Sequence, residues 1–200
     1  MSTLQLRQFD PSLSLNLPVL ESMSDGEFDA FCLANQDLRI ERTAEGEIIV
    51  MPPAFSDTGN RNGRLTQQLY NWADEDETGI AFDSSSGFTL PNGAKRSPDA
   101  AWILLERWHG LTPQQQASFA PLCPDFVVEL RSASDTLKSL QDKLAEYIEN
   151  GTRLGLLIDR KNRTVYRYRP GQAVEMLDEP STVSCHPELP GFVLSMAKIW

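Results

Sequence analysis

A short apolar run that contains a single acid constrains this chain more than any other feature. Residues 124–131 read Pro-Asp-Phe-Val-Val-Glu-Leu-Arg, and their β-branched and aromatic side chains predict a buried strand. Glu129 lies inside that strand. Because a carboxylate removed from water is costly unless it is paired or coordinates a metal, Glu129 is a candidate functional residue. An ordinary structural ion pair is the alternative interpretation.

A helix and a second apolar strand follow this strand. Ser134 or Asp135 is suited to cap a helix whose apolar residues fall on one face, and Asn150-Gly151 ends it. Residues 153–159 then form a near-continuous apolar run. A strand, a helix and a strand in this order predict a right-handed parallel crossover.

The other segments predict a chain that mixes helices and strands. Helices are expected at residues 24–35, at residues 58–73 and within residues 111–121, and the acidic residues 74–77 are expected to break the second helix. Further strands are expected at residues 38–42, 47–51, 80–82, 88–90, 99–105, 164–169, 173–177 and 192–194. The first two of these strands should form a hairpin around Ala44-Glu-Gly46.

Length and apolar content predict one globular domain. The chain has 200 residues, of which 40% are hydrophobic, and this is enough for a single core. Residues 23–200 are expected to form that domain, and residues 1–22, which show no sustained period, an extended N-terminal arm. No apolar run reaches the roughly 18 residues of a membrane span, and the N-terminus lacks the plan of a signal peptide. A cytoplasmic location without membrane contact is expected.

Cysteine usage and charge narrow the function classes. Cys32, Cys123 and Cys185 are far apart and form no Cys-x-x-Cys pair, so neither a zinc site nor a disulfide framework is supported and reduced core thiols are expected. The formal net charge of −10 argues against a protein that coats nucleic acid. Positive charge is concentrated at residues 160–169, which predict either a solvated hairpin or a surface that attracts phosphate.

The parity of the strand selects the partners of Glu129. Asp125 lies on the same face, but four residues along a strand separate two side chains by roughly 13 Å, too far to share one ion. Asp99, at the start of another strand, is the natural second acid. Two carboxylates brought together repel each other, which a divalent cation such as Mg²⁺ between them relieves. The alternative is that Asp99 is an ordinary turn residue after Pro98.

A lysine on the following helix is the candidate cation. At 100° per residue, Lys143 lies about 90° from the centre of the apolar face, whereas Lys138 lies roughly 130° away. The stem of Lys143 can therefore run along apolar surface and bring its ammonium group to the sheet. The alternative is a solvated lysine paired with Asp142 or Glu146.

These motifs together resemble a known family. The set Pro98-Asp99 and Glu129-Leu-Arg131 is similar to the Pro-Asp…(Asp/Glu)-x-Lys pattern of restriction-endonuclease-like nucleases. A second likeness, to the narrower Uma-two family of endonucleases, runs from about Met23 to Trp200. The stretches that carry it are Gly46-Glu-Ile-Ile-Val-Met-Pro-Pro53, Ser97-Pro-Asp-Ala-Ala-Trp102, residues 124–132, residues 143–147 and Leu154-Gly-Leu-Leu-Ile-Asp159.

The resemblance implies a fold and a metal site. The fold is mixed α/β with a restriction-endonuclease-like core, a central mixed β-sheet flanked by helices, and additional N-terminal and C-terminal strands. The implied ligands of Mg²⁺, with Mn²⁺ as a substitute, are Asp99, Glu129 and the backbone carbonyl of Leu130. Arg131 stands where the broader pattern has lysine, and Lys143 matches the lysine that the narrower family takes from the helix.

The same resemblance implies a further acid from the first half of the chain. Glu41 and Glu47 are the candidates, and Glu47 ranks first because it lies in a matching stretch.

The expected function is metal-assisted hydrolysis of phosphodiester bonds in nucleic acid, with DNA favoured over RNA. Asp99, Glu129 and Lys143 are the expected catalytic residues. Nucleic-acid affinity should be weak and salt-sensitive, and a homodimer is plausible because two cuts in a duplex need two sites. Two other hypotheses remain open: an inactive nuclease-fold module that binds nucleic acid or a protein partner, and a purely structural ion pair between Glu129 and Lys143.

Overall fold

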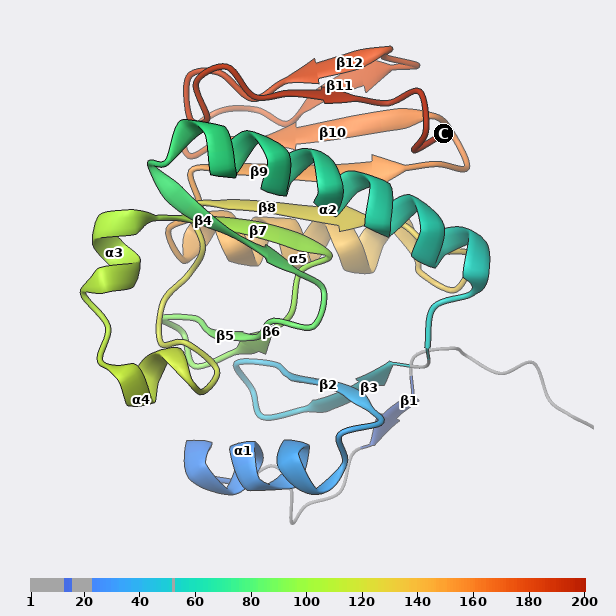
Figure 1. Ribbon diagram of the computed structural model, residues 1–200. Helices are drawn as coiled ribbons and strands as arrows, with labels where there is room; N and C mark the ends of the chain where they lie inside the picture. Colours follow the sequence, from blue (N-terminus) through green and yellow to red (C-terminus); the bar gives the residue numbers. More distant parts are fainter. Residues whose placement is uncertain (1–12, 16–22, 52) are drawn as a thin grey trace, which may run out of the picture.

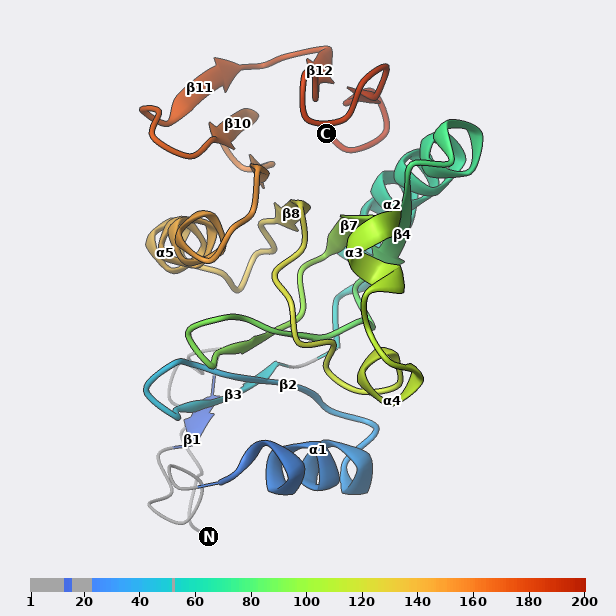
Figure 2. The ribbon, with the colours of Figure 1, turned by 90° about the vertical axis from the view of Figure 1, so that its left-hand side faces the viewer.

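A six-stranded mixed sheet forms the centre of the structure, a computed structural model that describes residues 13–15, 23–51 and 53–200. The strand order is β11-β10-β9-β8-β7-β4. The strands are β4 (Gly79–Asp83), β7 (Ala100–Leu104), β8 (Phe126–Leu130), β9 (Leu154–Asp159), β10 (Thr164–Tyr168) and β11 (Glu175–Asp178). Helix α2 (Ser56–Asp76) covers one face of this sheet and helix α5 (Leu137–Glu149) the other (Figures 1 and 2).

A second sheet lies at one side of the first, with helix α1 (Asp25–Ala34) on its outer surface (Figure 2). Its strand order is β1-β3-β2-β6-β5. The strands are β1 (Leu13–Leu15), β2 (Arg39–Arg42), β3 (Ile48–Met51), β5 (Phe88–Thr89) and β6 (Lys95–Arg96). The short helices α3 (Leu105–His109) and α4 (Pro113–Gln116) follow β7, and the hairpin of β12 (Thr182–Ser184) and β13 (Val193–Ser195) packs beside α2.

The predicted acid-bearing strand is the buried strand β8. It pairs antiparallel with β7 and parallel with β9, and Glu129 lies opposite Leu157 in that parallel register. Every residue from Phe126 to Leu130 is buried. The even-numbered side chains pack toward α2 and the C-terminal hairpin, whereas Val127 packs toward α5. The predicted parallel strand–helix–strand unit and the mixed central sheet are therefore confirmed.

Strand β2 brings two charged residues toward the central sheet. Successive side chains of a strand alternate between faces. Ile40 packs with Phe28 of α1 in the small outer core. Arg39 and Glu41, on the other face, meet Asp99, just before β7, and Lys143 of α5. The second sheet thus supplies polar groups to a site whose other groups come from the central sheet.

A glycine in β9 lets α5 approach the sheet closely. A Cβ atom at Gly155 would lie 2.6 Å from Cδ1 of Leu144. No real Cβ contact is that short, so any side chain at this position would push Leu144 away. Leu144 is fully buried and is the neighbour of Lys143 on α5. The glycine therefore helps to fix the height of Lys143 above the sheet.

Several local predictions differ from the structure. Helix α2 runs through the acidic stretch to Asp76, because Asp74 and Glu75 are exposed and leave the helix intact; it ends where Glu77 takes a left-handed φ of 56°. The cap of α5 is Thr136, whose hydroxyl accepts from the Ser139 backbone N–H. Strands β6 (Lys-Arg) and β12 (Thr-Val-Ser) were not predicted, because they contain at most one apolar residue and so show no apolar pattern.

The structure describes only part of the predicted N-terminal arm. Residues 13–15 form strand β1, which pairs antiparallel with β3. The remainder of residues 1–22 lies outside the described residues. In the part of the chain that the structure describes, no helix has both the length and the apolar character needed to cross a bilayer. All three cysteines are free, and Cys123 and Cys185 are buried.

Candidate active site

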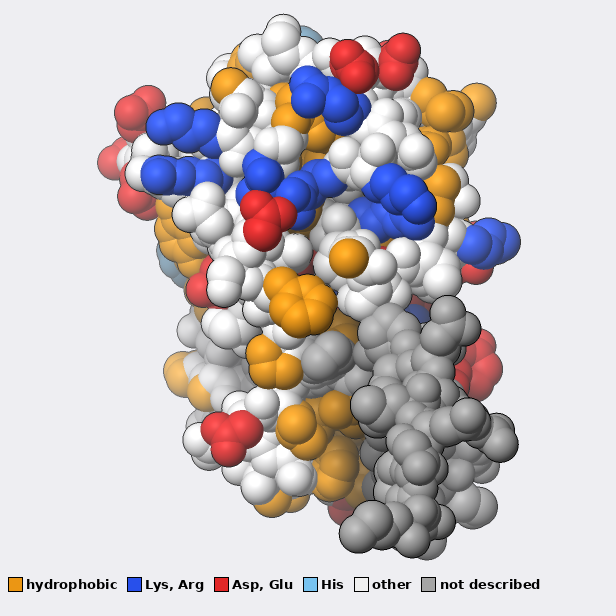
Figure 3. All heavy atoms as spheres, turned by 90° about the vertical axis from the view of Figure 1, so that its right-hand side faces the viewer, with side chains coloured by type: hydrophobic (Ala, Val, Ile, Leu, Met, Phe, Trp, Pro, Cys, Tyr) orange, Lys and Arg blue, Asp and Glu red, His pale blue; other side chains and the backbone are white. Residues whose placement is uncertain are grey.

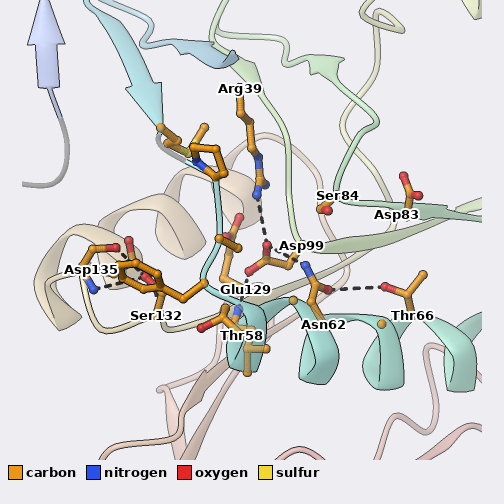
Figure 4. Close-up of a pocket in the computed structure, with 18 of the residues that line it drawn as sticks. Arg39, Thr58, Asn62, Thr66, Asp83, Ser84, Asp99, Glu129, Ser132 and Asp135 are labelled. Carbon is orange, nitrogen blue, oxygen red and sulfur yellow. Dashed lines mark hydrogen bonds and ion pairs between the residues drawn. The ribbon is translucent and has the colours of Figure 1, made fainter. Parts of the chain in front are cut away.

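A cavity of about 1020 Å³ opens where β2, β8, α2, α5 and Asp99, the residue before β7, meet. Figure 4 shows Arg39 of β2, Asn62 of α2 and Glu129 of β8 converging with Asp99. Lys143 also lines this cavity. The structure thus brings Asp99, Glu129 and Lys143, the three predicted catalytic residues, to one place.

Lys143 lies between two buried carboxylates. Its Nζ atom is 2.8 Å from Oε1 of Glu129 and 2.8 Å from Oε1 of Glu41. The side chain of Lys143 is only 11% exposed, whereas that of Lys138 is 77% exposed and pairs with Asp142 on the helix surface. The placement expected from the angles around the helix is confirmed, while the catalytic role of Lys143 stays a prediction.

Glu41, not Glu47, is the third acid at this site. Glu41 is buried on β2, and its Oε1 atom also accepts a hydrogen bond of 2.9 Å from the Ser97 backbone N–H. Glu47 is exposed at the β2–β3 hairpin, whereas Glu41 contacts Lys143. The structure therefore places Glu41, and not Glu47, next to the predicted catalytic residues, and a role for either acid as a metal ligand stays a prediction. Sequence similarity selected the stretch, but only the register of the hairpin shows which acid points inward.

Asp99 is held at the start of β7 by three donors. Its Oδ2 atom accepts from the Leu130 backbone N–H at 2.8 Å. Its Oδ1 atom accepts from Nδ2 of Asn62 at 3.2 Å and from Nη1 of Arg39 at 3.3 Å. The bond to Leu130 fixes Asp99 next to the strand that carries Glu129. The alternative, that Asp99 is only a turn residue, does not account for these long-range contacts.

The buried charges of the site are not balanced evenly. Burial raises the pKa of Glu129 to about 7, and the charges of Asp99 and Glu41 add to this effect despite the ion pair with Lys143. Burial also raises the pKa of Glu41, but Lys143 and Arg96 outweigh it and the net shift is downward. Burial lowers the pKa of Lys143, but the two glutamates outweigh it and the net shift is upward. Lys143 is therefore protonated at neutral pH, and Glu129 is the acid whose charge is least compensated.

Four further residues complete the site and were not predicted from the sequence. Arg39 and Asn62 contact Asp99, as described above. Arg96 is 3.3 Å from Glu41 and 2.6 Å from Glu146, and the Tyr147 hydroxyl donates to Oε1 of Glu129 at 3.4 Å. Tyr147 follows Lys143 by one helical turn, which was an available signal. No sequence signal identifies Asn62.

The charged residues at the two ends of β8 have structural roles. Arg131, at the position of the motif lysine, pairs with the fully buried Asp159 at 2.9 Å and does not line the cavity. Asp125, at the other end of the strand, pairs with Arg107 at 2.9 Å and accepts from the Leu104 backbone N–H. Both observations agree with a site in which Lys143 supplies the cation.

The donor set fits a divalent cation only in part. In the residues with described side chains, no three His, Cys, Asp or Glu side chains are grouped closely enough to hold a metal ion. Asp99 and Glu129 line one cavity together with Leu130, whose backbone carbonyl is the third expected ligand. Mg²⁺ usually takes one or two carboxylates and fills its other positions with water and phosphate oxygens. Two acids of which one is poorly compensated are therefore compatible with such a site.

Basic residues gather on one face beside the cavity (Figure 3). We call this surface the basic face and define it as Arg61 and Arg64 of α2 with Arg160 and Lys161 of the β9–β10 turn, two segments that Asp57 joins. Arg61 and Arg160 both pair with Asp57, at 3.0 Å and 2.5 Å, which joins the start of α2 to the β9–β10 turn.

The predicted basic segment of residues 160–169 is divided by the structure. Arg167 pairs with Glu175 at 2.6 Å, and Arg169 pairs with Glu188 at 2.9 Å. These two arginines lie on or just after β10, away from its turn. Arg163, nearer the turn, also pairs with an acid, Glu179, at 3.3 Å. Whether the whole segment attracts phosphate stays a prediction, and α2 adds basic residues beside its first part.

Two comparisons with known proteins identify the family and the fold of the chain. The Uma2 family model, described as "Putative restriction endonuclease", matches residues 25–197. A solved structure described as "a putative nuclease belonging to DUF820 from Anabaena variabilis ATCC 29413" aligns with a TM-score of 0.71 and 21% identity, over 88% of this chain and 97% of that chain. This likeness shows that the restriction-endonuclease-like fold is shared. No curated protein matches the chain.

The raised pKa of Glu129 predicts a specific dependence of stability on pH. Glu129 holds its proton more tightly in the folded protein than in the unfolded chain, so its contribution to stability is present below about pH 4.5 and is lost as the pH rises through about 7. In Glu129→Gln the side chain at this position does not titrate, so this loss of stability does not occur. Without metal, we expect the free energy of unfolding of the wild type to fall by about 2 kcal/mol relative to Glu129→Gln between about pH 5 and pH 8.

Urea denaturation in the presence of a chelator measures this difference. The exposed Glu45→Gln is the matched control and should follow the wild-type profile. Parallel profiles for the wild type and Glu129→Gln would show that Glu129 is already compensated.

Proposed function

Because the chain belongs to the Uma2 family, whose model is described as "Putative restriction endonuclease" and matches residues 25–197, we propose that the protein is a metal-dependent nuclease that hydrolyses phosphodiester bonds in DNA. The observation that carries this proposal is the position of the Lys143 ammonium, 2.8 Å from Glu129 and in the same cavity as Asp99. Two acids and a lysine at one cavity are the groups that metal-assisted phosphodiester hydrolysis needs.

Asp99, Glu129 and the backbone carbonyl of Leu130 would hold Mg²⁺, with Mn²⁺ as a substitute. The bound metal would polarise a phosphate oxygen and lower the pKa of a water molecule. Asn62 and the Leu130 N–H keep the Asp99 carboxylate in place. In this reaction the chain contributes a fixed pair of carboxylates beside a space large enough for a phosphodiester.

Lys143 acts as a charged donor and not as a base. Its pKa is raised because Glu129 and Glu41 outweigh the effect of burial, so it keeps its proton at neutral pH. A protonated ammonium can orient the attacking water and stabilise the negative charge that develops on the phosphate. Glu41, itself paired with Arg96 at 3.3 Å, holds Lys143 in this position.

A second candidate function is a nuclease-fold module that binds nucleic acid or a protein and cuts nothing. Two observations favour it: no three acidic, histidine or cysteine side chains form a ready metal site in the residues with described side chains, and Asp99 already pairs with Arg39. A purely structural role for the Glu129–Lys143 pair is the third candidate, and metal binding separates it from the first. A homodimer, which would supply one site for each of the two cuts in a duplex, remains a prediction.

Replacing Lys143 tests the nuclease proposal. We expect Lys143→Met to lower the cleavage rate by about a hundredfold or more, because it removes the donor for the developing charge. Cleavage is measured on a mixed panel of single- and double-stranded substrates with Mn²⁺. Lys138→Met is the matched control on the exposed side of the same helix and should cut at the wild-type rate.

Thermal melting of each lysine variant with and without Mn²⁺ accompanies the cleavage assay. Both variants should keep a metal-dependent rise in melting temperature. Equal cleavage by Lys143→Met and the wild type would contradict the role of Lys143. A wild type that binds Mn²⁺ and cuts nothing would favour the inactive module.

The basic face predicts where DNA binds. Arg64 and Lys161 are exposed on it, and neutralising both as Arg64→Gln and Lys161→Gln should reduce the slope of log affinity against log salt by about 2, because each phosphate contact contributes about 0.9. Binding of a short DNA duplex is measured by fluorescence anisotropy over a salt series without divalent metal.

Arg167→Gln with Arg169→Gln is the control for this experiment. These two arginines belong to the same stretch of sequence but are paired with Glu175 and Glu188, so their replacement should leave the slope unchanged. If the slope of log affinity against log salt falls only in the variant with Arg167→Gln and Arg169→Gln, DNA binds at the other end of β10.

A further inference from the structure

Arg39 is a cation within the candidate active site that the proposed reaction does not use. It begins β2 and points across the cavity toward Asp99 (Figure 4). Its Nη1 atom is 3.3 Å from Oδ1 of Asp99, and its Nη2 atom is 2.5 Å from the carbonyl oxygen of Ser97. Arg39 therefore places a positive charge against a carboxylate that a metal ion would need.

Arg39 is held less firmly than the other cation of the site. Its side chain is 32% exposed and contacts one carboxylate oxygen, whereas Lys143 is 11% exposed and lies 2.8 Å from two carboxylates. The Nε atom of Arg39 is buried and has no hydrogen-bond partner in the part of the chain that the structure describes. Arg39 also lines a second cavity of about 930 Å³, which shares Asp37 and Ser84 with the first. Arg39 thus borders two open spaces.

Withdrawal of Arg39 would leave its present acceptors satisfied. Oδ1 of Asp99 would keep Nδ2 of Asn62 at 3.2 Å, and Oδ2 would keep the Leu130 N–H at 2.8 Å. The Ser97 carbonyl would keep the Lys143 ammonium at 3.4 Å. A buried acceptor that loses its only donor is costly. That cost does not arise here, so the Arg39 contact is the one that the site can release.

We propose that Arg39 and a divalent cation compete for Asp99, and that a phosphate ester ends this competition by binding the Arg39 guanidinium. The proposal rests on the metal site of the proposed function. A guanidinium and a divalent cation beside one carboxylate repel each other. The planar fork of arginine matches phosphate oxygens, so a phosphate in the cavity offers Arg39 a new partner.

Metal and phosphate then bind cooperatively. Phosphate removes the competitor of the metal, and the metal removes the partner of Arg39, so each ligand tightens the binding of the other by the same factor. In the protein without ligands, Arg39 compensates part of the acidic charge at the site. The cation site is consequently completed only when a phosphate-bearing substrate arrives.

Calorimetric titration of the full chain with Mn²⁺, with and without thymidine 5′-monophosphate, tests this proposal. In the wild type, the nucleotide should tighten Mn²⁺ binding by about tenfold. Arg39→Met should bind Mn²⁺ about tenfold more tightly than the wild type without nucleotide, and nucleotide should then have no further effect on the variant.

Two variants make the result interpretable. Arg42→Met is the matched control, because Arg42 lies on the same strand but pairs with Asp25 at 2.5 Å outside the cavity; it should behave as the wild type. Arg39→Lys keeps the charge but cannot contact Asp99 and Ser97 with one rigid fork. Arg39→Lys should bind Mn²⁺ with an affinity between those of the wild type and Arg39→Met. If Arg39→Met does not fold, Arg39→Lys is the variant that tests the competition.

The outcomes separate this proposal from the nuclease function. If Arg39→Met and Arg39→Lys bind Mn²⁺ no more tightly than the wild type, or if no variant binds Mn²⁺, the competition is disproved. If the expected titrations are obtained but the wild type cuts no substrate, the competition stands and the nuclease activity does not.

Discussion

One buried ammonium group shared by two carboxylates holds this structure together at its functional centre. Lys143 of α5 joins Glu129 of the central sheet to Glu41 of the second sheet. Removing one partner of a buried ion pair typically costs about 3–5 kcal/mol, because the other charge is left uncompensated. The contact therefore ties the two sheets and one helix to a single arrangement. Gly155 contributes by letting α5 lie close to the sheet.

The distribution of charge around that ammonium sets the chemistry available to the site. Glu41 has a second cation, Arg96, and its pKa is lowered on balance; Glu129 pairs with Lys143, and its pKa is raised to about 7, chiefly by burial. The negative charge of Glu41 is thus compensated more fully than that of Glu129. Asp99 differs from both, because its cation is the more exposed Arg39. Under the proposed function, such a site would bind a metal most tightly when a phosphate-bearing substrate is present.

The sequence predicted the parts of the site that depend on local periodicity. The apolar run around Glu129 and the helical angle of Lys143 each follow from a repeat that a single element imposes on its own side chains. The choice between Glu41 and Glu47 depended on hairpin register, and the contact of Arg39 with Asp99 joins residues 60 positions apart. Such contacts depend on how separate elements pack, which no local pattern encodes. For the same reason the long helices and central strands were predicted well, whereas the two-residue strand β6 was not.

The proposed nuclease requires, above all, that a metal ion binds between Asp99 and Glu129. Crystals soaked with Mn²⁺ and a nucleoside monophosphate, measured for anomalous scattering, would locate that ion directly. We expect one strong peak within coordinating distance of both carboxylates and of the Leu130 carbonyl, with Lys143 still paired to Glu41. A strong peak elsewhere, or an empty position between Asp99 and Glu129 at saturating Mn²⁺, would contradict the metal-dependent site.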